Sequence, residues 1–345
     1  MDAARVLDVI PWLSWCLDDP VDKLFLWQMN MFARFDFGSL PRMNGLIGSA
    51  LIRANLTDFH VREILGFEPT GTGEHFVVEI CKRNQNTPWV AKVLADLAGV
   101  AVNDIGYCGL KDRLAETTQW FSLYSPKRHI EKDQLRHETF DVLNIDRHSK
   151  KLRRGDHKGN AFKITLREID FDRHVLRSRL NKIGLLGVPN YFGEQRFGVN
   201  ASNLFNAEKL IKIGRLRGNR HGSGFCLSAA RSWLFNLILA NHIEDYLKGE
   251  AFPFSQTGPL WGRGRSKADS CMLRKESRLL ANWSEWCYAL EHAGLTQERR
   301  KLIVLPDALS YEYLSSDTLT IKFELPRGCY ATVVLREIAQ LNRPR

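Results

Sequence analysis

The sequence contains seven cysteines in 345 residues, but no two of them form a CxxC pair. An odd number of widely spaced cysteines favours neither a disulfide framework nor a tetrahedral zinc site. The sequence also lacks an apolar run of about 18 residues, the length that a membrane-spanning helix needs. Proline and aspartate interrupt the apolar opening, which excludes a signal peptide as well. These absences predict a reduced, cytoplasmic protein without a membrane segment.

Cofactor motifs are also absent. No glycine-rich phosphate loop follows a predicted strand, which argues against an RNA methyltransferase or another nucleotide-binding enzyme. The ten histidines are scattered without metal-ligand spacing, and no repeat or low-complexity tract is visible. We therefore expect neither a metal nor an organic cofactor.

The composition is globular and basic. Hydrophobic residues make up 44% of the chain, and a length of 345 residues favours two domains. The chain has 49 Lys and Arg against 39 Asp and Glu, a formal net charge of +10. This excess predicts a polyanionic partner, nucleic acid before membrane, although a merely soluble basic surface would have the same composition.

The hydrophobic pattern predicts strands before about residue 170 and after about 308, with a mostly helical block between them. The predicted strands cover 50–53, 58–64, 75–82, 117–124, 162–166 and 319–325. The predicted helices cover 87–97, 172–183, 202–213, 228–247, 275–292 and 331–341, with Thr87 as an N-cap and 258–264 as an irregular loop. We therefore expect an inserted domain at 187–305 within a first domain at 41–186 and 306–345. Residues 1–40 are an appendage of unknown role.

The segment 106–113 places Asp112 on a glycine turn after a short predicted strand. Its neighbours Lys111 and Arg113 are cations, and nearby positive charge favours the ionised carboxylate that a nucleophile needs. Aspartate after glycine is also ordinary turn chemistry. On this segment alone, a catalytic carboxylate and a plain turn both remain open.

Basic residues are concentrated around the Lys-Gly-Asn-Ala-Phe sequence at 158–162. They are Arg147, His148, Lys150, Lys151, Arg153, Arg154, His157 and Lys158. A solvated hairpin has this composition, but RNA binders also place cations for phosphate contacts beside an aromatic ring for base stacking. We favour the second interpretation, which makes Phe162 a candidate RNA contact.

Four ordered motifs resemble the TruD family of tRNA pseudouridine synthases, from about residue 45 to the C-terminus. They are Arg-Ala-Asn at 53–55 with Asp-Phe at 58–59, Gly-Leu-Lys-Asp at 109–112, Lys-Gly-Asn-Ala-Phe at 158–162 and Asn-Tyr-Phe-Gly-Glu-Gln-Arg-Phe-Gly at 190–198. The last motif is highly specific. The resemblance implies an α+β fold, with a bent antiparallel sheet in the catalytic domain and a mostly helical insertion of the family's own.

The resemblance also implies an activity, the isomerisation of uridine to pseudouridine at position 13 in the D-arm of tRNA. Asp112 matches the family's catalytic aspartate. Phe162 matches the aromatic that stacks on the target base, Asn160 its polar neighbour, and Phe59 a further aromatic of the site. At Arg53 the family commonly has lysine, and arginine would pair with the aspartate in a more fixed geometry. Lys111 and Arg196 are further candidates for substrate binding.

This chemistry explains the residue types. The target uracil must leave the RNA stack, so the site needs an aromatic face for the base and cations for the phosphates. A carboxylate then assists cleavage of the bond between ribose C1′ and uracil N1, and the base is rejoined through C5. Attack on the ribose, attack on the base and assisted elimination all remain open. A monomer acting on tRNA is expected.

A non-catalytic RNA-binding or RNA-chaperone protein is the alternative. Asp112, Asn160 and Phe162 favour the enzyme, because binding alone requires no carboxylate beside RNA phosphates. Two structural alternatives also stay open. Phe59 has the alternation of a core residue, and Arg196 could link the two domains by ion pairing.

Overall fold

The computed structural model describes residues 34–216 and 223–344, which form two compact units. The sheet unit contains residues 42–191 and 302–344. The helical unit contains residues 34–41, 192–216 and 223–301. Residues 1–33 of the predicted appendage lie outside the described residues. The assignment of catalysis to one of the units stays a prediction.

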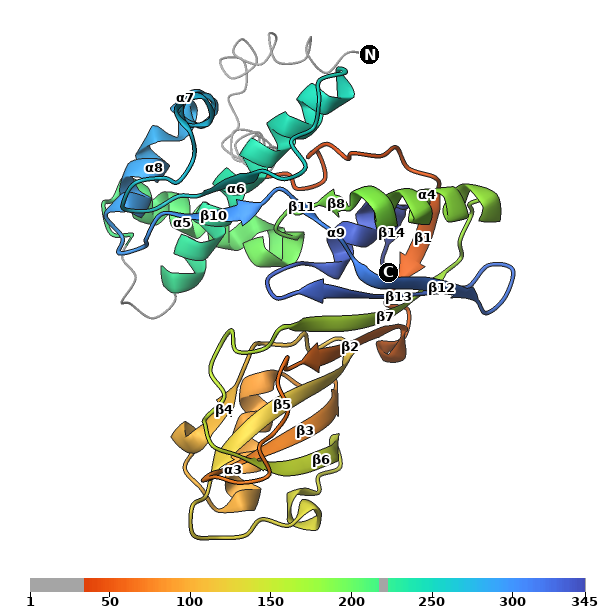
Figure 1. Cartoon of the computed structure of the whole chain (residues 1–345), viewed down its shortest axis with the longest axis vertical. Coiled ribbons are helices and arrows are strands. Elements are labelled where there is room, and N and C mark those ends of the chain that lie inside the picture. Colours follow the sequence, from red (N-terminus) through yellow and green to blue (C-terminus); the bar gives the residue numbers. More distant parts are fainter. Residues whose placement is uncertain (1–33, 217–222, 345) are drawn as a thin grey trace, which may run out of the picture. The chain divides into compact units, whose positions relative to one another are not determined.

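The sheet unit is built on a ten-stranded sheet with the order β12-β13-β7-β2-β5-β3-β6 (Figure 1). These strands are β2 (Phe59–Ile64), β3 (His75–Arg83), β5 (Glu116–Tyr124), β6 (Phe140–His148), β7 (Gly159–Arg167), β12 (Asp307–Tyr313) and β13 (Leu319–Pro326). Off this path, β1 (Ser49–Ile52) pairs with β14 (Gln340–Asn342) and β7, and β4 (Ile105–Tyr107) pairs with β5. A separate two-stranded sheet joins β8 (Val188–Pro189) to β11 (Ile303–Val304).

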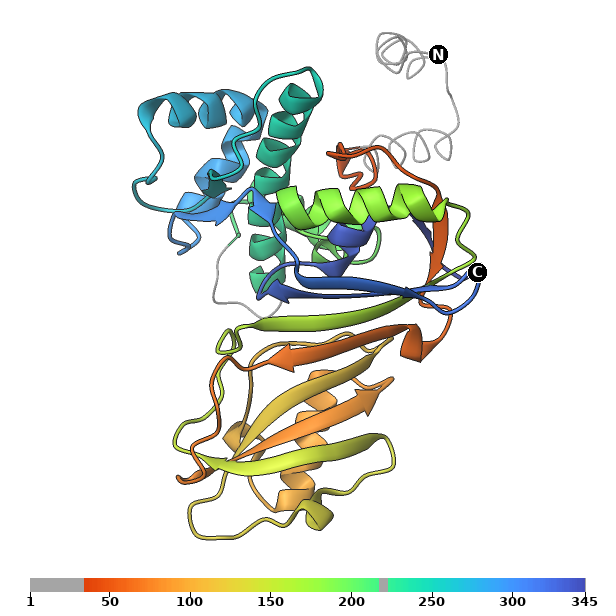
Figure 2. The ribbon, with the colours of Figure 1, turned by 45° about the vertical axis from the view of Figure 1, so that its right-hand side comes forward.

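The expected α+β class is confirmed, with one correction to the sheet. The pairs β1–β14 and β2–β5 are parallel, so the sheet is mixed and not wholly antiparallel. The chain reaches β5 from β2 only after passing through β3 and α3 (Thr87–Ala98), a crossover long enough to return it in the same direction. Figures 1 and 2 show the strands inclining progressively from β13 through β7 and β2 to β5.

Helices cover the sheet in two places. A core cluster joins β2, β7 and β13 to α4 (Arg173–Leu186) and α9 (Ala331–Arg336), and another joins β3 and β5 to α3. The predicted N-cap of α3 is corrected by one residue. The side chain of Asn86 caps the helix by accepting from Trp89 N at 2.9 Å. The hydroxyl of Thr87 is thereby free for contacts outside the helix.

Strand register brings Asn160 and Phe162 of the 158–162 motif onto one face with residues of β2 and β5. Val61 lies opposite Thr117 of β5 and Phe162 of β7, and Glu63 lies opposite Asn160. Cross-strand partners point to the same face, and so do alternate residues of one strand. The side chains of these five residues therefore share the sheet face that carries the core clusters.

The helical unit contains α5 (Ser202–Lys212), α6 (Ser223–Leu247), α7 (Ser270–Leu279) and α8 (Ser284–Glu291). The predicted helix at 275–292 is two helices, because Leu280 leaves helical geometry at φ −96° and ψ 12° and a short 3-10 turn follows. The predicted irregular loop at 258–264 is also corrected. Its first residues belong to β9 (Thr257–Leu260), which pairs with β10 (Glu298–Lys301).

Residues 34–40 of the predicted appendage are packed within the helical unit. The ring of Phe35 lies 5.1 Å from that of Phe205 and 5.7 Å from those of Trp233 and Trp286, measured between centroids. Arg34 pairs with Glu208 at 2.7 Å. Across residues 34–216 and 223–344, no helix has the length and hydropathy to cross a membrane.

Candidate active site

The turn that carries Asp112 is fixed through its main chain. The carbonyl oxygen of Gly109 accepts from the side-chain amide of Gln119 at 2.5 Å, and the amide of Lys111 donates to Thr87 Oγ1 at 3.0 Å. Thr87 in turn donates to Gln119 Oε1 at 2.9 Å. The first residue of α3 and the middle of β5 thus hold the turn together, which leaves the Asp112 side chain 47% exposed.

Arg53 is the cation that contacts the carboxylate. Its Nη2 donates to Asp112 Oδ2 at 2.7 Å, and its Nη1 donates to the carbonyl oxygen of Leu114 at 3.3 Å. The guanidinium carbon lies 4.1 Å from the ring centroid of Phe59. Arg53 has φ 61°, a left-handed conformation that is unfavourable for a residue with a side chain. In this conformation the Arg53 side chain lies between the Phe59 ring and the Asp112 carboxylate.

Lys82 supports the same turn through hydrogen bonds to main-chain oxygens. Its fully buried ammonium donates to the carbonyl oxygen of Gln85 at 2.6 Å and to that of Asp112 at 3.2 Å. Burial lowers the pKa of Lys82 to about 8, although the nearby Asp112 carboxylate opposes this shift. A titratable cation therefore contacts the main chain of the candidate nucleophile.

The two sequence neighbours of Asp112 do not flank its carboxylate, contrary to prediction. Lys111 pairs at 2.6 Å with Glu63, and both side chains are buried, at 7% and 0% exposure. Arg113 donates to the side chain of Asn84 at 3.2 Å. The reason is the turn geometry, since adjacent residues of a turn point in different directions. Burial raises the pKa of Glu63, and the Lys111 ammonium opposes that shift.

The aromatic pair predicted for the site is assembled but mostly buried. The rings of Phe59 and Phe162 meet edge to face, with centroids 6.4 Å apart, and Phe162 also packs on Phe323 at 5.5 Å. Phe59 is 4% exposed and Phe162 is 9% exposed. Both belong to the core cluster of β2, β7 and β13. Both rings therefore stabilise the sheet, and the Phe59 ring also lies against Arg53 of the aspartate site.

On the central strands β5 and β7, two buried polar atoms of this face have no hydrogen-bond partner among the described residues. They are Asn160 Oδ1 and Thr117 Oγ1. Buried polar atoms in folded proteins are nearly always hydrogen bonded, so an unpartnered one needs an explanation. Both residues face the same side of the sheet as Phe162, by register. They are suitable hydrogen-bonding groups for a ligand bound over the central strands.

The basic loop between β6 and β7 packs against the strands of the Asp112 turn. Gly155 N donates to Cys108 O at 2.8 Å, and Leu152 N donates to Ser122 Oγ at 2.9 Å. The side chains of Arg153 and Arg154 are exposed. His157 is not a cation of this loop, because burial, together with the Lys111 charge, lowers its pKa to about 4.

Arg196 belongs to the helical unit, and the structure does not join it to the other predicted site residues. Its Nη2 donates to the Ser228 hydroxyl, and its guanidinium carbon lies 6.0 Å from the ring centroid of Phe192. The neighbouring motif aromatics Tyr191, Phe192 and Phe197 are buried. This segment therefore contributes packing, and its specific sequence reflects that role as well as any contact with RNA.

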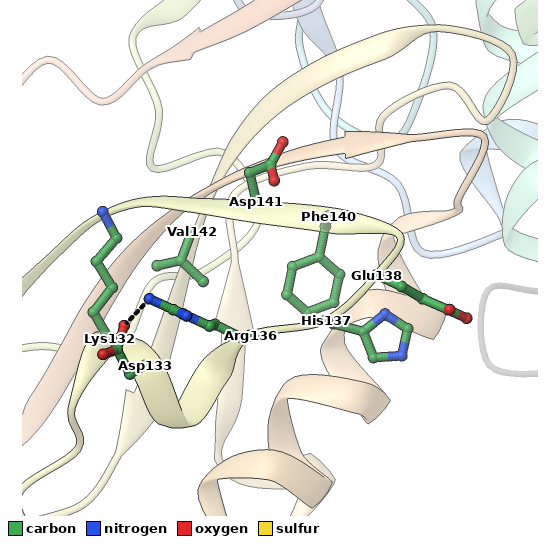
Figure 3. A pocket seen from close by; sticks show the side chains of 8 residues that line it. All are labelled: Lys132, Asp133, Arg136, His137, Glu138, Phe140, Asp141 and Val142. Atoms are coloured by element: carbon green, nitrogen blue, oxygen red, sulfur yellow. Dashed lines mark ion pairs between the residues drawn. The ribbon is translucent and has the colours of Figure 1, made fainter.

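A hollow of about 510 Å³ lies beside β6, and Figure 3 shows the side chains that line it. Its lining has both signs of charge, including the ion pair of Arg136 and Asp133 at 2.8 Å. None of the predicted site residues lines it. Within the described part of the chain, no group of three or more His, Cys, Asp or Glu residues is arranged to hold a metal ion.

The fold is shared with the crystal structure named for tRNA pseudouridine synthase D (TruD) from Methanosarcina mazei. The TM-score is 0.62 at 21% sequence identity, over 86% of this chain and 95% of that one. A family model described as tRNA pseudouridine synthase D (TruD) matches residues 43–217 and 248–338.

Curated relatives agree with the family model. The chain is 46% identical over 315 residues to a tRNA pseudouridine synthase D of Cellvibrio japonicus, covering 88% of this chain and 93% of the relative. It is 40% identical over 327 residues to that of Nitrosococcus oceani, covering 85% and 91%. The chain therefore belongs to the tRNA pseudouridine synthase D (TruD) family.

Sequence reasoning missed the supporting residues Glu63, Lys82, Thr117 and Gln119. Each lies inside a strand, where alternation predicts a face but not a three-dimensional partner. Lys82 could have been noticed as a cation at the end of the largely apolar stretch Phe76–Cys81, and Glu63 as a carboxylate at an apolar position of β2. Both are charges in places where a strand normally carries core residues.

Proposed function

We propose that this protein isomerises uridine 13 of tRNA to pseudouridine, with Asp112 as the catalytic nucleophile. The observation that carries the proposal is the Asp112 carboxylate itself. It is 47% exposed, and it is paired at 2.7 Å with a strained arginine on a turn fixed by hydrogen bonds to α3, β3 and β5. A plain surface turn needs none of these supports.

The surrounding residues support distinct steps. Arg53 holds the carboxylate in a fixed orientation before substrate arrives. Asn160 and Thr117 present buried oxygen atoms that can hydrogen bond the uracil edge. Phe162 is the aromatic that stacks on the base. During the reaction the bond from ribose C1′ to N1 breaks and a bond from C1′ to C5 forms, so product and substrate are isomers.

The proposal includes further assignments. The sheet unit carries the chemistry, and a monomer acts on tRNA without a metal or an organic cofactor. Lys111 acts as a positioning residue through Glu63, because its buried ammonium cannot reach a bound phosphate without breaking that pair. Arg153 and Arg154 are exposed cations beside the turn and supply phosphate contacts.

The test uses unmodified tRNA carrying a labelled uracil. Wild-type protein is expected to form pseudouridine at position 13 only, and tRNA with cytidine at that position is expected to yield none. Asp112→Asn should abolish product while tRNA affinity stays within a few-fold, because affinity comes mainly from phosphate contacts. The matched control is Asp96→Asn on the exposed surface of α3, which should be fully active. Tight tRNA binding without pseudouridine in the wild type would instead favour the non-catalytic RNA-binding protein.

A further inference from the structure

The loop from β9 to α7, residues 261–269, concentrates positive charge in the helical unit. Arg263, Arg265 and Lys267 are all exposed, and none of the three makes a side-chain ion pair or hydrogen bond with another described residue. The one acidic residue of the loop, Asp269, is occupied as the N-cap of α7, where it accepts from Met272 N at 2.8 Å. The loop thus presents three cations that no described side chain pairs with, although Asp269 within it and Glu291, which accepts from Trp261 Nε1 at 2.9 Å, are acidic neighbours.

The main chain of this loop is held against the segment before β10. Gly262 N donates to Gln297 Oε1 and Arg263 N donates to Leu295 O, both at 2.7 Å, and Gln297 N donates to Arg263 O at 2.8 Å. Glycine is required at 262, because a Cβ there would lie 2.7 Å from Leu295 O. The first half of the loop therefore has one defined path.

A buried ion pair fixes the second half. Arg299 of β10 pairs at 2.6 Å with Glu276 of α7, and these side chains are 11% and 1% exposed. The same guanidinium donates to Ser266 Oγ at 3.1 Å. The three cations fall within five residues of this loop, and its main chain is already held by hydrogen bonds. A segment that is ordered before binding loses less entropy when an anion binds.

We propose that the β9–α7 loop is a phosphate-binding element that contacts the tRNA backbone through Arg263, Arg265 and Lys267. The proposal rests on tRNA as the substrate and deepens it by adding a contact surface outside the sheet unit. The contacts are to phosphate oxygens and carry no sequence information. They therefore contribute to the capture of tRNA and leave the chemical step untouched.

The experiment compares two double variants that remove the same charge from the helical unit. Arg263→Gln with Arg265→Gln removes two loop cations, and Lys209→Gln with Lys248→Gln removes two exposed cations elsewhere. Affinity for unmodified tRNA is measured directly between about 50 and 200 mM KCl, the range over which phosphate contacts are strongly salt-dependent. Melting temperatures of all proteins check that the substitutions leave the fold unchanged.

Loss of two phosphate contacts should reduce the slope of log affinity against log salt by about 1.4 to 1.8. At about 0.1 M salt this corresponds to a rise in Kd of roughly 25- to 60-fold. The control pair should keep the wild-type slope, and the single-turnover rate at saturating protein should be unchanged in both. A wild-type slope in the loop variant, or an equal loss in the control pair, would overturn the proposal. Binding is measured without turnover. A wild type that forms no pseudouridine would therefore refute the proposed activity, and the salt dependence of tRNA binding would still test the loop.

Discussion

The ammonium group of Lys82 hydrogen bonds the main-chain oxygen of Asp112 at 3.2 Å, while the Asp112 carboxylate is left to Arg53. One buried cation thus holds the position of the candidate nucleophile, and another residue holds its side chain. The pKa of Lys82 is lowered to about 8 by burial, with a further lowering by Lys111 and an opposing effect of Asp112. The support for the turn therefore titrates close to physiological pH.

The activity is predicted to fall as the pH rises through about 8, because Lys82 then loses the charge that supports the Asp112 turn. Single-turnover rates of pseudouridine formation across this range provide the measurement. Lys82→Met should lose most of the activity and should not show the decline near pH 8. A variant that keeps the wild-type pH profile would remove Lys82 from the explanation.

The contribution of Lys82 to stability changes with pH in the opposite direction to its effect on activity. The two effects can therefore be measured separately. Its folded-state pKa, about 8, lies below the ordinary value of 10.5, so between these values the unfolded chain binds more protons. The contribution of Lys82 to stability therefore increases with pH over this window, while activity decreases. Melting temperatures at both ends of the window are the control. Unfolding in parallel with the loss of activity would contradict the local explanation.

Arg53 is predicted to be replaceable by lysine but not by an uncharged residue. Arg53→Lys retains a cation near Asp112 but loses the planar stacking on Phe59 and the second donor to Leu114. We expect a loss of about tenfold in kcat/KM, equivalent to about 1.4 kcal/mol. Arg53→Met should lose at least a further tenfold. Equal activities of the lysine and methionine variants would show that the charge is not used.

The pair of Lys111 and Glu63 is predicted to be structural. Lys111→Met leaves the Glu63 carboxylate buried and unpaired, so it should lower stability by about 3–5 kcal/mol. The double variant Lys111→Met with Glu63→Gln should recover part of that loss, because no uncompensated charge remains. Denaturant unfolding measures both. If Lys111→Met instead keeps its stability and weakens tRNA binding, the original interpretation of Lys111 as a substrate contact is the correct one.

The sequence predicted which residues belong to the site better than it predicted their side-chain partners. Asp112, Arg53 and Phe59 do lie together, and they were assigned to one site by the resemblance of their motifs to the TruD family, because turn and strand signals alone left the roles of Asp112 and Phe59 open. The partners of Lys111 and Arg113 were wrong, since side-chain direction within a turn depends on the whole strand register. Lys82 was not identified, because its role depends on Gln85 and Asp112 meeting in space. The sequence pattern also did not predict the break between α7 and α8, because both helices have apolar faces.

The basic loop beside the Asp112 turn gives a further prediction. Arg153 and Arg154 are exposed, and neutralising both should reduce the salt slope of tRNA binding by about 1.4 to 1.8 if each contacts a phosphate. Filter binding of unmodified tRNA at several salt concentrations measures this slope. Lys92→Gln on α3 is a control for loss of exposed charge in the same unit. An unchanged slope would favour the alternative interpretation, in which the loop is a solvated hairpin that does not contact tRNA phosphates.

The last prediction concerns Phe162, whose burial raises the question of packing against base stacking. At 9% exposure and 5.5 Å from Phe323, the ring is a core side chain, so Phe162→Ala should cost about 3–5 kcal/mol of stability. That variant cannot separate the two roles, because it removes packing and stacking together. A substitution that conserves apolar volume is needed.

Phe162→Leu provides the separation. It should cost less than about 1.5 kcal/mol of stability, because the apolar volume is nearly retained. Base stacking on an aromatic ring contributes about 1–3 kcal/mol, so the leucine variant should lose about 5- to 150-fold in kcat/KM while Phe162→Tyr stays active. Phe323→Leu is the matched control, since Phe323 is buried in the same cluster and should affect stability alone. Wild-type activity of a folded Phe162→Leu protein would show that the ring serves packing only and that the stacking role inferred from the family is wrong for this chain.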